Sequence, residues 1–154
     1  MISKKNAHKS SVLGLIVLKN GFVLSGSNDQ FIRVWNPDGF NLVNTLVSVV
    51  SNSSGTSNSG VRDMSIVLHE NEEFVSIHDD DSIRLWEPTT NLEPTFLVNS
   101  RMNHSDQVLA VTFLNNTNYL ASGSRDKTII IWDLIAMNVF QTLFGHSNDV
   151  IKTI

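Results

Sequence analysis

Apolar positions along the chain fall into short runs of β-branched and aromatic residues, and Gly, Asn and Asp separate these runs. The first runs are VLGLIVL (12–18), GFVLSGS (21–27) and FIRVW (31–35). No stretch has the 3.6-residue period of an amphipathic helix. The pattern therefore predicts an all-β protein made of short strands and hairpins.

The same pattern occurs three times when the sequence is aligned on its tryptophans. The segments SGSNDQFIRVW, SIHDDDSIRLW and SGSRDKTIIIW end at Trp35, Trp86 and Trp132. Each has a serine ten places, and an aspartate six places, before the tryptophan. Such self-similarity indicates a repeat architecture.

The third unit gives the length of one repeat. It contains apolar runs at 107–114, 119–124, 128–132 and 139–143, and 42 residues separate His104 from His146. Four strands in about 42 residues are the unit of a propeller blade. The longest insertion between units is SNSSGTSNSG, residues 51–60. Because it is polar and of low complexity, we expect a mobile loop there.

The third unit resembles the WD40-repeat β-propeller family, through His104, the segment LASGSRDKTIIIWD and the Gly-His pair at 145–146. The resemblance implies WD40 β-propeller blades: three complete four-stranded antiparallel blades plus the first strand of a fourth, which is a partial propeller. The expected bounds are a lead-in at 1–7 and a partial propeller at 8–154, with blade 1 at about 8–50, the loop insertion at 51–60, blade 2 at about 61–99, blade 3 at about 104–144 and the start of blade 4 at 145–154.

The resemblance also implies a buried hydrogen-bond network in each blade, formed by a loop histidine, a strand serine, a turn aspartate and a strand tryptophan. A buried indole N–H or imidazole needs a hydrogen-bond partner in any fold, which gives the network a physical reason. The expected members are His8, Ser25, Asp29 and Trp35, then Ser76, Asp80 and Trp86, then His104, Ser122, Asp126 and Trp132, with His146 as the loop histidine of the fourth blade.

The second unit departs from this pattern. Ser57 stands where the other units have the loop histidine, and Ile77 replaces the glycine seen at Gly26 and Gly123. We therefore expect blade 2 to be the least stable blade.

Charge and composition narrow the function. The 11 basic and 15 acidic residues give a net charge of −4, and the basic residues are scattered, so we expect no nucleic-acid or membrane partner. The chain has no cysteine, which fits an intracellular compartment, cytoplasmic rather than nuclear. Lys4, Lys5 and Lys9 before the apolar run 12–18 are arranged as in a signal peptide, but a first strand accounts better for that run.

Two constellations suggest chemistry. His104, Ser122 and Asp126 are the residue types of a hydrolase triad, but the set recurs with a tryptophan that no triad needs, and no Gly-x-Ser-x-Gly elbow is present. The run HDDD, 78–81, contains metal-ligand residue types, but consecutive residues of a strand point in alternate directions. We expect no catalytic residue, no metal and no cofactor, and a hydrolase remains only an alternative.

In similar propellers, the loops before the first strand and between the second and third strands share one face, on which protein partners bind. The resemblance thus implies a non-catalytic scaffold for protein or peptide partners. Because three and a quarter blades do not close a ring, we expect a fragment of a longer propeller, or alternatively a module completed by another copy. The expected partner-binding residues are Ser10, Asn28, Arg62, Asp79, Asp106 and Arg125.

Overall fold

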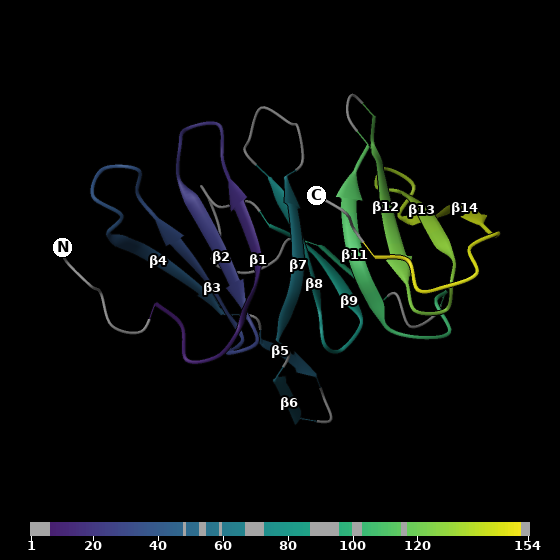
Figure 1. Cartoon of the computed structure of the whole chain (residues 1–154), viewed down its shortest axis with the longest axis horizontal. Helices are drawn as coiled ribbons and strands as arrows, with labels where there is room; N and C mark the ends of the chain where they lie inside the picture. The colour runs from purple at the N-terminus through teal and green to yellow at the C-terminus, as the bar shows by residue number, and fades with distance from the viewer. Residues whose placement is uncertain are drawn as a thin grey trace.

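Three four-stranded antiparallel sheets follow one another along the chain and lie side by side, and we call them blades 1, 2 and 3 (Figure 1). The expected all-β blade architecture is confirmed. Where the structure describes the chain, no helix is long and apolar enough to cross a membrane. The computed structural model describes residues 7–47, 49–52, 55–58, 60–66, 73–86, 96–99, 103–114 and 117–151.

In each blade the strands are paired in the order in which they occur in the sequence. Blade 1 contains β1 (Val12–Val17), β2 (Val23–Ser27), β3 (Phe31–Trp35) and β4 (Leu42–Val47). Blade 2 contains β7 (Val61–Ile66), β8 (Phe74–His78), β9 (Ser82–Trp86) and β10 (Phe96–Asn99). Blade 3 contains β11 (Val108–Phe113), β12 (Tyr119–Ser124), β13 (Ile129–Asp133) and β14 (Asn138–Leu143).

Short turns join the second and third strands of all three blades, with three residues in blades 1 and 2 (28–30 and 79–81) and four in blade 3 (125–128). The third residue of each turn, Gln30, Asp81 or Lys127, has φ of 76°, 59° or 70°. A left-handed residue near the end of a short hairpin loop bends the chain back into the next strand. None of the three residues is a glycine, so each turn contains a residue in a conformation that disfavours its Cβ.

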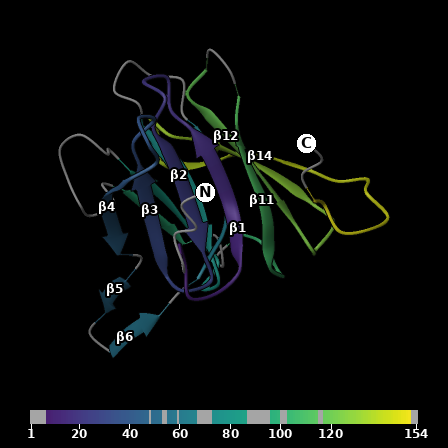
Figure 2. The same ribbon diagram turned by 60° about the vertical axis from the view of Figure 1, so that its left-hand side comes forward.

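The polar insertion differs from the expected loop. Strands β5 (Val49–Asn52) and β6 (Gly55–Asn58) form an antiparallel hairpin with Val49 opposite Asn58 and Asn52 opposite Gly55. Cross-strand pairing satisfies backbone groups whatever the side chains are, and Val and Thr favour extended backbone. The hairpin projects beyond the end of the sheets at which β1, β7 and β11 begin (Figures 1 and 2).

Two hydrophobic cores hold the blades together. We call the face of a blade that is directed at the preceding blade its leading face, and the opposite one its trailing face. The first core joins Leu24, Ile32 and Leu46 of the blade 1 trailing face to Met64, Phe74 and Trp86 of the blade 2 leading face. The second core joins Val75, Ile77 and Ile83 of blade 2 to Val111, Leu120 and Trp132 of blade 3.

The leading face of blade 1 has no blade packed on it within the described residues. Leu15, Met64 and Val111 are equivalent, because they lie opposite the network serines of their blades. Met64 and Val111 are each 1% exposed, whereas Leu15 is 67% exposed. The same position is therefore core in blades 2 and 3 and surface in blade 1.

Residues 144–151 leave β14 and return across the trailing face of blade 3 (Figure 1). The Val150 amide donates a hydrogen bond of 3.0 Å to the Ser124 carbonyl. The Val150 side chain packs on Gly123, as Val61 packs on Gly26 in blade 1. Val150 thus occupies the place of the first residue of a next blade, and the strand expected at 145–154 stays a prediction.

Candidate functional site

The sequence-predicted residues of blade 1 are brought together by hydrogen bonds. The Trp35 indole Nε1–H donates to Ser25 Oγ at 2.9 Å, and His8 Nε2 lies 2.7 Å from the same oxygen. His8 Nδ1 lies 3.0 Å from both carboxylate oxygens of Asp29. Arg33 Nη1 donates to Asp29 Oδ2 at 2.9 Å and also contacts the His8 ring.

Blade 3 has the same arrangement without the arginine. Trp132 Nε1–H donates to Ser122 Oγ at 2.7 Å, and His104 Nε2 lies 2.9 Å from that oxygen. His104 Nδ1 lies 2.9 Å from Asp126 Oδ2. The Thr128 hydroxyl donates to Asp126 Oδ1 at 2.6 Å. A loop, two strands and a turn are thereby linked in one buried cluster.

The turn aspartates of these two blades are held in the ionised state. Burial alone would raise the pKa of Asp29, but the hydrogen bonds that it accepts, first from the Lys9 amide, lower the pKa well below its usual range. Burial acts in the same way on Asp126. There the Thr128 hydroxyl and the Ser105 amide outweigh it and lower the pKa to about 2.

Blade 2 has a histidine in its network, although the loop position lacks one. Trp86 Nε1–H donates to Ser76 Oγ at 2.7 Å, and His78 Nε2 lies 2.6 Å from the same oxygen. All three residues are fully buried. The expectation that the blade 2 network has no histidine is therefore wrong. It considered only the loop before the first strand, whereas the histidine comes from β8.

Arg84 is the second residue that sequence reasoning missed. Its guanidinium Nη2 donates to Asp80 Oδ2 at 2.7 Å, and the Arg84 side chain is 0% exposed. Burial would raise the pKa of Asp80, but hydrogen bonds from Ser82 and the charge of Arg84 lower it. An arginine two places before the tryptophan, at 33 and 84, was the signal in the sequence.

His146 lies apart from these networks. It is exposed in the segment after β14. Its expected place in a network stays a prediction.

The six expected partner-binding residues lie at the end of the blades from which the β5–β6 hairpin projects, and we call this end the loop face. Ser10, Asn28, Asp106 and Arg125 are exposed there. Arg62 differs, because its Nε donates to Asp79 Oδ1 at 2.6 Å and its Nη1 to the Val108 carbonyl at 3.3 Å. Arg62 therefore also joins blade 2 to blade 3.

Asn28 of blade 1 and Asp79 of blade 2 meet over the backbone of Gly60. A Cβ on Gly60 would lie 2.5 Å from Asp79 Oδ2 and closer still to Asn28 Oδ1. The Asp79 amide donates to the Gly60 carbonyl at 2.9 Å. A side chain at position 60 would push these two polar groups apart, so glycine lets them converge between the blades.

A polar hollow of about 410 Å³ lies on the loop face between blades 2 and 3. Two of the expected partner-binding residues, Asp79 and Asp106, line this hollow. All of its lining residues carry side-chain groups that can form hydrogen bonds. The lining residues are Asp79, Asp81, His104, Ser105, Asp106 and Gln107.

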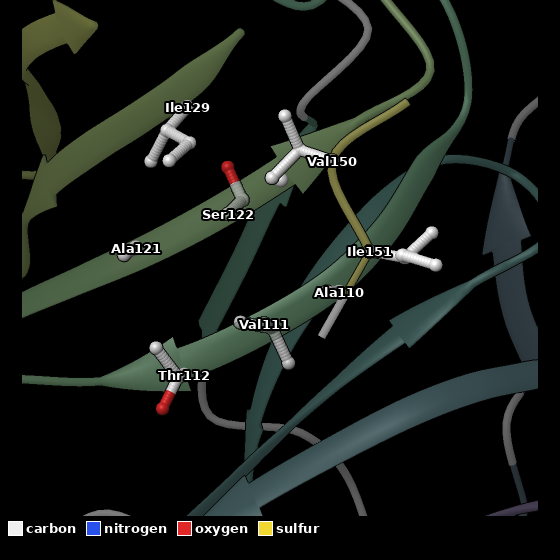
Figure 3. A pocket seen from close by; sticks show the side chains of 9 residues that line it. Ala110, Val111, Thr112, Ala121, Ser122, Ile129, Val150 and Ile151 are labelled. Atoms are coloured by element: carbon white, nitrogen blue, oxygen red, sulfur yellow. The ribbon is translucent and has the colours of Figure 1, made fainter. Parts of the chain in front are cut away.

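A second, apolar hollow of about 130 Å³ lies on the trailing face of blade 3 (Figure 3). It lies between β11 and β12 on one side and the returning segment with Val150 and Ile151 on the other. Small residues, Ala110, Ala121 and Gly123, line its floor. Its composition matches a packing surface between blades.

The metal interpretation of HDDD has no geometric support. Among the described residues no group of three or more His, Asp or Glu side chains is arranged to hold a metal ion. His78 contacts Ser76, and Asp80 contacts Arg84, so these side chains have structural partners.

Comparisons with known proteins agree with this architecture. The family model described as WD domain, G-beta repeat matches residues 2–36 and 96–133. Nuclear distribution protein nudF 1 of Talaromyces marneffei is 32% identical over 129 residues, which are 81% of this chain and 25% of that protein. Nuclear distribution protein PAC1 of Arthroderma otae is 28% identical over 137 residues, with 81% of this chain and 27% of that protein covered. The chain thus spans about a quarter of the length of these relatives.

Solved structures show the same fold. The structure of U3-55K superposes with a TM-score of 0.77 and 23% identity, covering 93% of this chain and 42% of that one. The crystal structure of the RRP9 WD40 repeats gives a TM-score of 0.76 and 22% identity, with 93% and 41% covered. Together with the Trp–Ser–His contact that recurs in all three blades, these likenesses establish that the chain belongs to the WD40-repeat family of β-propeller proteins.

Proposed function

We propose that the chain is a non-catalytic interaction scaffold that binds a protein or peptide partner on its loop face, without a metal or cofactor. The main support is the polar hollow between blades 2 and 3, which opens among exposed loop residues on a scaffold of packed sheets. Loops held by such a scaffold are common positions for binding residues. We place the protein inside the cell, in the cytoplasm rather than the nucleus.

The buried networks support a scaffold over a hydrolase. Ser122 is 0% exposed, and its oxygen already accepts the Trp132 indole N–H. A nucleophilic serine must reach a substrate carbonyl, which this packing does not allow. Blades 1 and 2 repeat the same Trp–Ser–His contact, as expected of a structural device.

We also propose that the chain is part of a longer propeller whose further blades cover the leading face of blade 1. The support is the exposure of Leu15 at a position that is buried in both other blades. A second candidate is self-assembly, in which another copy supplies the missing contact. Light scattering of the purified chain tests it: one defined oligomer supports self-assembly, and a monomer contradicts it.

The partner-binding proposal is tested with peptides from a random phage-displayed library that bind the chain. Asp106 lines the hollow, whereas Asp38 is exposed in the turn between β3 and β4, at the opposite end of the blades. Asp106→Ala should weaken peptide binding several-fold, and Asp38→Ala, which removes the same charge, should leave it unchanged. Equal affinities for both variants would contradict binding at the loop face.

A further inference from the structure

The network of blade 2 differs from the other two in the part of the chain that supplies its histidine. In blades 1 and 3 the histidine precedes the serine by 17 and 18 residues, and it lies in the loop before the first strand. In blade 2 His78 follows Ser76 by two residues. One hairpin, β8–β9, supplies both hydrogen-bonded groups of blade 2, which are Ser76, His78 and Trp86 in one and Asp80 and Arg84 in the other.

The contact of His78 with the network serine matches that of the loop histidines. Its Nε2 lies 2.6 Å from the serine oxygen, compared with 2.7 Å for His8 and 2.9 Å for His104. Each serine oxygen also accepts the indole N–H of its own blade. His78 therefore gives Ser76 the second partner that a buried hydroxyl and indole require.

The position of His78 is occupied by serine in the other blades. Val12 pairs with Ser27, Val61 with His78, and Val108 with Ser124. A histidine at this position lies on the same strand as the network serine and two residues after it, so both side chains are on the same face of the sheet. The histidine–serine contact of blade 2 therefore does not depend on the loop before the first strand.

The segment before β7 is where the β5–β6 hairpin is inserted. This hairpin projects from the loop face rather than lying on a sheet (Figures 1 and 2). In blades 1 and 3 the corresponding segments contain His8 and His104. An insertion in either segment would therefore displace a histidine of the network.

We propose that the hairpin, residues 49–58, is energetically separable from blade 2, because His78 provides from within β8 the contact that a loop histidine provides in the other blades. Residues can accordingly be inserted or removed in this part of the loop face while the Trp86–Ser76 hydrogen bond stays intact. His78 is the residue that makes such an insertion compatible with a folded blade.

The three tryptophans allow a test inside the full chain. Each indole Nε1–H gives its own NMR signal, and its hydrogen exchange reports opening of its own blade. In one variant, two glycines replace residues 50–57. Val49 and Asn58 are cross-strand partners, and such partners lie about 5 Å apart, so the linker spans the gap. In the second variant, His78→Ser introduces the residue found in the other blades.

Removal of the hairpin should leave the exchange rate of the Trp86 indole within about twofold of its original value. His78→Ser should raise that rate about tenfold or more, with Trp132 unchanged. His104→Ala is the matched control and should raise exchange at Trp132 and not at Trp86. The proposal is overturned if loss of the hairpin accelerates Trp86 exchange as much as His78→Ser does, or if His78→Ser has no effect on Trp86.

Discussion

The indole N–H of Trp132 and the hydroxyl of Ser122 are joined by a hydrogen bond of 2.7 Å, and both side chains are buried. Ser122→Ala removes the acceptor and leaves the indole and His104 without their shared partner. An unsatisfied buried polar group costs about 1–3 kcal/mol. We therefore expect chemical denaturation to show a loss of unfolding free energy of this size.

Ser105→Ala is the matched control for Ser122→Ala. Ser105 is exposed, and it donates its backbone amide to Asp126, a hydrogen bond that alanine keeps. The free energy of unfolding should stay within about 0.5 kcal/mol of the original, as for most surface substitutions. A loss of stability shared equally by both variants would mean that the buried bond has no special weight.

Acid should destabilise the chain through its turn aspartates. The pKa of Asp126 is lowered to about 2 in the folded state, against about 3.9 in an unfolded chain. The ionised form is therefore favoured by folding, and its contribution is complete above pH 4 and is lost as the pH falls towards 2. The unfolding free energy should decline over this range, and Asp126→Asn should flatten part of the decline. A decline of unchanged slope in Asp126→Asn would contradict this assignment.

Most of the fold could be predicted from the spacing of serine, aspartate and tryptophan. The strands 119–124 and 31–35 have the predicted bounds, because apolar alternation and turn residues fix them locally. The β5–β6 hairpin was not predictable from composition, since backbone pairing does not require apolar side chains.

The network of blade 2 shows why a motif is an incomplete guide to a site. An alignment of repeats identifies hydrogen-bond partners by their sequence position, whereas a hydrogen bond requires only that donor and acceptor lie close together in space. His78 reaches Ser76 from a position where the other blades have serine, and Arg84 reaches Asp80 across the turn. The expectation that blade 2 is the least stable rested on a missing loop histidine and on Ile77 in place of glycine. His78 removes the first reason, and the expectation itself stays a prediction.

Lys127→Gly should stabilise the chain. Lys127 has φ of 70° and is exposed in the turn between β12 and β13. A left-handed conformation costs a non-glycine residue about 1–2 kcal/mol, and the greater flexibility of unfolded glycine offsets part of the gain. We expect a net gain of about 0.5–1 kcal/mol in thermal or chemical denaturation. Lys127→Ala keeps a Cβ in the same conformation, and a similar gain in that variant would show that loss of the lysine charge, and not backbone strain, is responsible.

Alanine should cost more stability at Gly26 than at Gly14, although both glycines face blade 2. A Cβ on Gly26 would lie 2.6 Å from Cγ1 of Val61, and a Cβ on Gly14 would lie 2.9 Å from Cγ of Met64. Valine is β-branched and restricted at χ1, whereas methionine has three rotatable side-chain bonds and can move aside. Gly26→Ala should therefore cost about 1–3 kcal/mol, as overpacked cores do, and Gly14→Ala clearly less. Equal losses in urea denaturation would mean that the backbones of blades 1 and 2, and not these two side chains, limit how closely the sheets approach.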